Sequence, residues 1–190
     1  MTVDLSIQQS RVVGQNDTHA ASCGPVLVVA ARSGDREAFG LLYERYGAMV
    51  HGVLLARVPV DDVDDLVQDV FLSAFQKLGS LRQPEAFGGW LAAIARRRAV
   101  DHHRHTRVTV DPTDLPAVDH TARADALEVL AVIRTLPDAY RETLTLRLVE
   151  GMTGPEIADR TGLTPASVRV NLHRGMKQLR AKLGATPERT

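Results

Sequence analysis

Residues 153–177 constrain the fold of this chain most, because their capping and turn residues specify two short helices joined by a tight turn. Thr153 and Glu156 have the spacing of a capping box, which predicts that the first helix begins there. Gly162 permits the positive φ angle that a sharp turn requires. Thr164 is followed by a proline, an N-cap before a residue suited to the first helical position. These signals together predict a helix-turn-helix.

The second of these helices combines an apolar stripe with a basic remainder. Apolar residues recur at steps of three and four, at Val168, Leu172, Met176, Leu179 and Leu183. The cations lie off this stripe, at Arg169, Arg174, Lys177, Arg180 and Lys182, and residues 163–183 contain no acid. A helix-turn-helix that presents its second helix to the DNA major groove needs this arrangement. A helical hairpin with a solvated basic face is the alternative, and the cap and turn spacing favours DNA binding.

Charge is segregated along the chain, although the net charge is zero. Residues 57–69 hold five carboxylates, whereas residues 94–107 hold five arginines and a single aspartate. One acidic and two basic surfaces predict two kinds of partner. Aromatic residues make up only 4% of the chain, which argues against a large aromatic-lined cavity.

Compartment signals in the sequence are few. Cys23 is the only cysteine, so no intramolecular disulfide can form, in keeping with a reducing cytosol. No stretch reaches the roughly 18 consecutive apolar residues of a membrane span. The short apolar run at residues 25–31 lacks a signal-peptide layout. We therefore expect a cytoplasmic protein that is not inserted directly into a membrane.

Helical spacing of apolar residues occurs in two blocks, and no strand-like alternation with turns is present. The predicted fold is all-α, with two small helical domains joined by a flexible linker. The predicted divisions are a flexible leader at 1–25, a first domain at 26–107, a linker at 108–121 and a second domain at 122–185. The linker prediction rests on two prolines among three aspartates, with no lysine or arginine.

Several motifs occur in the order and spacing of a known family. They are an acidic helix at 64–71, Phe87–Leu91 followed by 94–101, a Leu-Pro start at 136–151, and the hairpin at 162–174. In these motifs the chain resembles the extracytoplasmic-function (group 4) sigma factors of the sigma-70 family, over residues 26–183. The resemblance implies a sigma factor that binds core RNA polymerase, recognises −35 and −10 promoter elements and promotes strand opening for transcription initiation.

The resemblance implies that the acidic helix docks on the clamp helices of the polymerase β′ subunit, with the β subunit as a further partner. The best candidates for this contact are Asp65 and Gln68, and Asp62 and Asp69 support them. An arginine of the partner is expected to donate a charge-assisted hydrogen bond to Asp65. The alternative is a solvated helix start, where carboxylates suit the positive end of the helix dipole.

The resemblance assigns the −10 element to the segment that begins at Trp90. The candidate residues are Trp90, Arg96, Arg97, Arg98 and Arg104. Trp90 also has the spacing of a core residue, and core packing is the alternative for it. The family captures a flipped base in the loop that corresponds here to residues 80–88, at a cost of a few kcal/mol that pocket contacts offset. Arg97 stands where the family usually has asparagine.

The second helix of the hairpin is the candidate reader of the −35 element. The candidate residues are Ser167, Arg169, Asn171, Arg174 and Lys177. Arg169 suits guanine and Asn171 suits adenine, each worth about 1–3 kcal/mol of discrimination in a bidentate pairing. Lys177 is better suited to phosphate, which gives affinity without sequence preference.

The sequence predicts no metal site, no cofactor and no enzymatic activity. Asp101 and His105 are the only pair with i, i+4 ligand spacing in the histidine cluster, and neighbouring arginines would repel a divalent ion. The chain lacks a nucleophile elbow and a phosphate-cradling glycine loop. The alternative function is a dimeric helix-turn-helix regulator that does not bind core polymerase, which leaves the acidic helix unexplained. The resemblance further implies an anti-sigma factor as partner.

Overall fold

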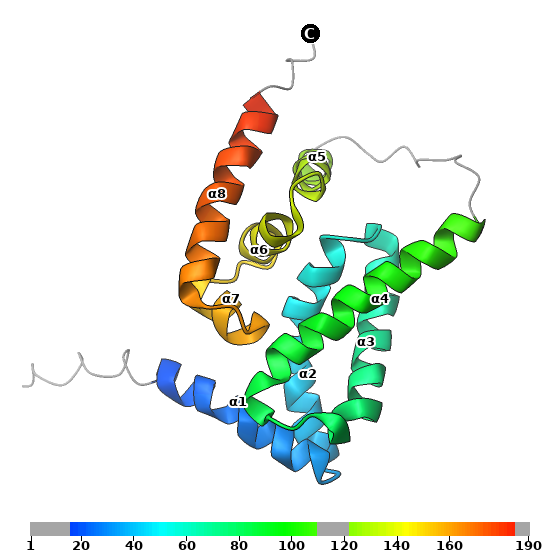
Figure 1. Cartoon of the computed structure of the whole chain (residues 1–190), viewed down its shortest axis with the longest axis vertical. Helices are drawn as coiled ribbons and strands as arrows, with labels where there is room; N and C mark the ends of the chain where they lie inside the picture. Colours follow the sequence, from blue (N-terminus) through cyan, green and yellow to red (C-terminus); the bar gives the residue numbers. More distant parts are fainter. Residues whose placement is uncertain (1–15, 110–121, 185–190) are drawn as a thin grey trace, which may run out of the picture.

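The computed structural model describes residues 16–109 and 122–184, and all regular structure in these two ranges is helical (Figure 1). The first helical block consists of α1 (Asn16–Arg32), α2 (Arg36–Leu55), α3 (Val63–Lys77) and α4 (Phe87–Thr109). The second helical block consists of α5 (Ala122–Arg134), α6 (Asp138–Leu148), α7 (Gly154–Thr161) and α8 (Pro165–Gly184). The predicted all-α fold is confirmed. Residues 110–121 of the predicted linker and residues 1–15 of the predicted leader lie outside the described residues.

Helix α1 begins inside the segment that the sequence suggested as a flexible leader. It starts at Asn16, ahead of the apolar run, and packs on α2. Val28 is fully buried in this contact, and a Cβ atom at Gly24 would lie 3.2 Å from the Tyr46 hydroxyl. The polar residues before Pro25 lack amphipathic spacing, and so their helical state left no pattern in the sequence.

The first helical block packs α1, α3 and α4 around the central helix α2. Asp35 caps α2, because its carboxylate accepts a hydrogen bond of 3.0 Å from the Ala38 amide. The core of the first helical block consists of side chains that recur every three or four residues, among them Leu42, Met49, Val53, Val70, Phe71, Leu91 and Ala95. Burying each such side chain stabilises the block by roughly 1.5–3 kcal/mol before entropy is counted. The same spacing leaves the outer faces of α3 and α4 free for other contacts.

The second helical block contains the predicted helix-turn-helix in α7 and α8. Thr153 and Glu156 form the capping box, with the Glu156 carboxylate 2.8 Å from the Thr153 amide. Gly162 ends α7 in the left-handed region with φ of 74°. The Thr164 hydroxyl accepts a hydrogen bond of 3.1 Å from the Ser167 amide at the start of α8. The helix caps and the turn predicted from the sequence are thus confirmed.

The two blocks pack against each other, and one apolar core runs through both. Residues of the second block that join the core of α2 and α4 are Leu130, Leu146, Met152, Ile157, Ala158 and Val168. Helix α6 lies against α2, and α7 lies against the start of α4 (Figure 1). The sequence predicted two domains and did not predict this closed arrangement. Within the described residues, no helix combines the length and the apolar character that a bilayer crossing requires.

Candidate nucleic-acid interface

The outer face of α8 carries the cations expected to meet the −35 element. Arg169, Arg174 and Lys177 are exposed on this helix. Their opposite face is apolar and turned inward, with Val168 and Leu179 buried against the rest of the second block. Helix α8 forms an outer edge of the molecule, away from α3 (Figure 1). The exposed cations are therefore accessible to a long polyanion such as DNA.

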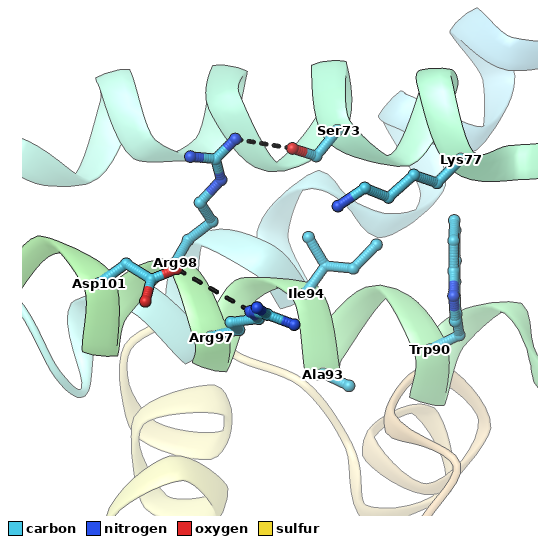
Figure 2. Close-up of a pocket in the computed structure, with 8 residues that line it drawn as sticks. All are labelled: Ser73, Lys77, Trp90, Ala93, Ile94, Arg97, Arg98 and Asp101. Atoms are coloured by element: carbon cyan, nitrogen blue, oxygen red, sulfur yellow. Dashed lines mark hydrogen bonds and ion pairs between the residues drawn. The ribbon is translucent and has the colours of Figure 1, made fainter.

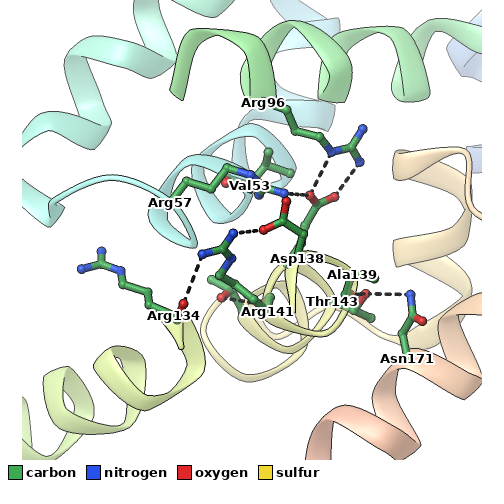
Figure 3. A network of polar contacts seen from close by, with 11 residues as sticks. Val53, Arg57, Arg96, Arg134, Asp138, Ala139, Arg141, Thr143 and Asn171 are labelled. Carbon is green, nitrogen blue, oxygen red and sulfur yellow. Dashed lines mark hydrogen bonds and ion pairs between the residues drawn. The ribbon is translucent and has the colours of Figure 1, made fainter. Parts of the chain in front are cut away.

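Two other candidates of the same helix are engaged inside the second block. The Asn171 side-chain amide donates a hydrogen bond of 3.4 Å to the Thr143 hydroxyl of α6 (Figure 3). Ser167 is half-buried as a residue, and its hydroxyl lies 2.8 Å from the Thr164 hydroxyl in an exposed contact. The structure therefore leaves the three cations exposed and turns Asn171 toward α6.

Three of the four acidic-helix candidates share an open face of α3. Asp65, Gln68 and Asp69 are exposed, and the face continues into Leu72, which is 58% exposed. Asp62 lies just before α3 and is half-buried, where its carboxylate lies 3.1 Å from Nε2 of His102. An acidic face with an apolar extension suits a basic, partly apolar protein surface.

The consecutive arginines of α4 point in three directions. Arg96 reaches the second helical block, and Arg98 donates a hydrogen bond of 2.7 Å to the Ser73 hydroxyl of α3. The Arg97 side chain is 85% exposed, with its nearest carboxylate, that of Asp101, 4.0 Å away. Arg104 is exposed near the end of the helix. Arg97 is therefore the one of the three consecutive arginines most available to a ligand.

A cavity of about 500 Å³ lies between α3 and α4, beside these arginines (Figure 2). Its lining residues are Ser73, Lys77, Trp90, Ala93, Ile94, Arg97, Arg98 and Asp101. Trp90 is half-buried and contacts Phe87 at 5.8 Å between ring centroids, so it is both a packing residue and a wall. An aromatic wall beside cations can stack a base and hold its phosphate. The sequence had not singled out Lys77, which stands one helical turn after Ser73.

The histidines after Asp101 make separate contacts. His102 faces Asp62, and Nε2 of His103 lies 2.7 Å from the Arg57 carbonyl oxygen. His105 Nδ1 lies 2.8 Å from the carbonyl oxygen of Asp101, one turn back. In the part of the chain that the structure describes, no group of three histidine, cysteine, aspartate or glutamate side chains could hold a metal ion.

A buried carboxylate of the second block holds Arg96. The Glu142 carboxylate of α6 accepts hydrogen bonds from Arg96 at 2.7 and 2.9 Å and from Arg57 at 2.7 Å (Figure 3). Burial raises the pKa of Glu142, but the bonds from Arg96 and the charge of Arg57 outweigh it and hold the pKa below its ordinary value. Glu142 was not among the residues predicted from the sequence, where its only local signal is an acid directly before the run Thr-Leu-Thr-Leu.

Comparison with known proteins assigns both blocks to one family. Residues 42–109 match the family described as Sigma-70 region 2, and residues 126–179 match Sigma-70, region 4. The sigma factor CarQ of Myxococcus xanthus is 32% identical, over 80% of this chain and 93% of CarQ. The ECF sigma factor BldN of Streptomyces coelicolor is 29% identical over 80% of this chain, which spans 63% of BldN.

A solved structure resembles the whole arrangement. It is that of CnrH in complex with the cytosolic domain of CnrY, and its sequence is 29% identical to this chain. The two align with a TM-score of 0.62 over 87% of this chain and 99% of that chain. The match extends over both helical blocks, since each block alone is far shorter than the aligned length.

Proposed function

This chain belongs to the sigma-70 family as a sigma factor of the extracytoplasmic-function type, and we propose that its two blocks divide promoter recognition between them. It is an RNA polymerase sigma factor for transcription initiation and not an enzyme. Core polymerase catalyses RNA synthesis, and the chain directs it to promoter sequences and helps to open the DNA strands.

The second block is proposed to read the −35 element through α8. The observation that carries this assignment is the exposure of Arg169, Arg174 and Lys177 on a helix with no acid. Arg169 lies in the second turn of α8, where helix-turn-helix proteins contact base edges. Lys177 lies two turns further on and is proposed to bind phosphate. Asn171 would have to leave Thr143 to read adenine.

The first block is proposed to bind the −10 element as single-stranded DNA. The cavity between α3 and α4 supports this assignment, because Trp90 offers a stacking surface and Arg97 and Lys77 offer phosphate contacts. Stacking on an aromatic side chain is worth about 1–3 kcal/mol per base, enough to offset much of the cost of flipping.

The open face of α3 is proposed to contact the β′ clamp helices of core polymerase. Asp65, Gln68 and Asp69 supply acceptors there, and Leu72 adds an apolar contact. We also propose that a dedicated anti-sigma factor binds this chain in the cytoplasm. The complex of CnrH with the cytosolic domain of CnrY supports a regulatory partner of that kind.

The test is run-off transcription on fragmented genomic DNA, with core polymerase and with or without the chain. Discrete new transcripts are expected, and aligning their starts yields both promoter elements. Asp65→Ala should weaken core binding, whereas Glu128→Ala, which removes an exposed acid of α5, should not. Absence of transcripts together with absence of core binding would favour the dimeric regulator.

A further inference from the structure

The contact between the two blocks contains an ion cluster of one carboxylate and two guanidinium groups. Glu142 of the second block is only 7% exposed, and it bridges Arg57 (10% exposed) and Arg96 (37% exposed) of the first block. Two cations around one anion leave a net positive charge, as in a site that binds phosphate. Hydrogen bonding to Glu142 raises the pKa of Arg96, against the opposing effect of burial, so both groups stay charged at neutral pH.

We propose that Glu142 takes the place of a DNA phosphate on Arg96, so that the second block inhibits the first block of the same chain until the two separate. This inference rests on the proposed −10 contact of the first block, and it adds Arg96 as a DNA ligand beside Arg97 and Lys77. Carboxylate and phosphate oxygens offer arginine the same bidentate geometry. DNA and Glu142 therefore compete for one guanidinium.

The spacing of the two promoter elements is larger than the closed chain. The names of the two elements put them about 25 base pairs apart, which is roughly 85 Å at ~3.4 Å per pair. A compact body of this many residues has a radius of gyration of only about 15 Å. The closed form cannot reach both elements, so the blocks have to separate before the whole promoter is bound.

The closed contact depends on glycines at points where a side chain would not fit. A Cβ atom at Gly88 would lie 2.3 Å from the Arg160 carbonyl oxygen of α7, a backbone atom that cannot rotate away. A Cβ atom at Gly52 would lie 2.8 Å from both Leu146 Cδ2 and Glu150 Cγ of the second block. Both glycines are helical, where glycine costs about 1 kcal/mol relative to alanine. Tolerating that cost at these positions permits close packing of the blocks.

Further polar contacts hold the rim of the same interface. Arg45 pairs with Asp159 at 2.9 Å, and the Arg134 guanidinium donates hydrogen bonds of 2.9 and 2.6 Å to the carbonyl oxygens of Leu55 and Val58. Asp65 and its neighbours on α3 remain exposed in the closed chain. Closure thus withholds Arg96 from DNA and leaves the proposed polymerase-binding face open.

The test measures opening and DNA binding separately on the full chain. Spin labels are placed on cysteines at the exposed positions Gln76 and Gln178, in a Cys23→Ser background. Two variants attack the contact by different means: Glu142→Gln removes the charge, and Gly88→Ala adds the clashing Cβ. The matched controls are Glu128→Gln, on exposed α5 surface, and Gly40→Ala, where a Cβ meets nothing within 4 Å.

We expect both interface variants to give longer, broader label-to-label distances and the controls to keep the wild-type distance. Affinity for a fluorescent random-sequence single-stranded 20-mer should rise about tenfold in the open variants, as expected when a competent fraction of about one tenth becomes dominant. Adding Arg96→Ala to Glu142→Gln should remove most of that gain. Gly88→Ala keeps the test available if Glu142→Gln folds poorly, and circular dichroism checks folding.

Longer distances with unchanged DNA affinity would overturn the proposal, and so would unchanged distances in both variants. Run-off transcription by the wild-type preparation tests the proposed function independently, because the distance measurement needs neither promoter nor polymerase. Opening with increased DNA affinity, in a chain that yields no transcripts, would retain the competition at Arg96 and reject the proposed function.

Discussion

The two basic surfaces of this molecule, on α8 and on α4, differ in what their cations contact. The cations of α8, among them Arg169 and Arg174, are exposed on a helix that has no acid from its start to its end. On α4, by contrast, Arg96 is bound to Glu142, Arg98 is bound to Ser73, and Arg97 remains exposed. One surface is available to DNA as it stands, and the other is largely satisfied by the protein itself.

This difference indicates an order of events in promoter binding. A surface of exposed cations attracts phosphate from a distance and exchanges only counterions and water. Arginines that already hold a buried carboxylate release it only when something replaces it, because an unpaired buried charge is costly. We therefore expect the −35 contact of α8 to need no rearrangement, whereas a contact of Arg96 with the −10 element should need separation of the blocks.

Arg57→Ala should destabilise the folded chain by about 3 kcal/mol, because it removes one partner of a buried ion cluster. Arg57 is 10% exposed, and its guanidinium also donates a hydrogen bond of 2.9 Å to the Val53 carbonyl oxygen. Urea unfolding followed by circular dichroism measures the free energy of unfolding.

Arg97→Ala is the matched control for that change. Its side chain is 85% exposed and lies 4.0 Å from its nearest carboxylate, so its removal should alter the free energy of unfolding by less than about 0.5 kcal/mol. The same variant should weaken binding of single-stranded DNA. Equal losses in the free energy of unfolding for Arg57→Ala and Arg97→Ala would contradict the expectation that the buried arginine stabilises the fold more than the exposed one.

Arg169→Ala should reduce discrimination between promoter sequences by about 1–3 kcal/mol. The reason is its position early in α8, where a guanidinium can reach a guanine edge. Competition binding with single-base variants of the −35 element measures the change. Arg180→Ala, an exposed cation nearer the end of α8, should instead weaken all sequences alike and reduce the salt dependence. A uniform loss in Arg169→Ala would remove it from base reading.

Local signals explain what the sequence could predict. The capping box of Thr153 and Glu156, the turn at Gly162 and the N-cap at Thr164 each act within a few residues. Their energetics do not depend on the rest of the fold, so spacing alone was sufficient. The exposed candidates on α3 and α8 followed from the same helical periodicity, which separates an inner from an outer face.

Long-range contacts explain what the sequence could not predict. Arg57 and Glu142 are 85 residues apart, and a single acid in a helix does not identify its partner. Gly88 belongs to a family motif in the sequence, and only the 2.3 Å between an added Cβ atom and the Arg160 carbonyl oxygen reveals why a side chain is excluded. Asn171 stands next to the apolar stripe, where periodicity alone does not decide between groove and core. Its hydrogen bond to Thr143 decides it for this closed structure.

Gly162→Ala and Gly151→Ala together separate backbone strain from contact between the blocks. Both glycines have positive φ angles, 74° and 68°, so alanine at either should cost about 1 kcal/mol. A Cβ atom at Gly162 would also lie 3.3 Å from Gly89 Cα of the first block, whereas none lies within 4 Å at Gly151. We expect Gly162→Ala to cost a few tenths of a kcal/mol more and to lengthen the label-to-label distance. Equal losses in the free energy of unfolding and equal label-to-label distances for the two variants would show that the contact of Gly162 with Gly89 does not contribute to closure.

The smallest expected effect is a pH dependence of closure through His51. Its Nδ1 lies 2.7 Å from Glu150 of the second block, and this hydrogen bond raises the pKa of His51, with burial opposing it. A raised pKa in the closed state means that the contribution is complete below the ordinary value of about 6.5 and is lost as the pH rises through the raised value. Because His51 is 37% exposed, solvent screening limits the contribution to about 0.5 kcal/mol.

Label-to-label distances measured between pH 5.5 and 8.5 test this dependence, with His51→Gln as the variant that should abolish it. The carboxylate of Glu142 acts in the opposite sense, since its pKa is lowered and its contribution is lost only as the pH falls through that lowered value. Opening above neutrality therefore reports His51, and opening in strong acid reports Glu142. A wild-type chain that loosened from pH 7 down to pH 5.5 would contradict both assignments, because both groups favour the closed state throughout that range.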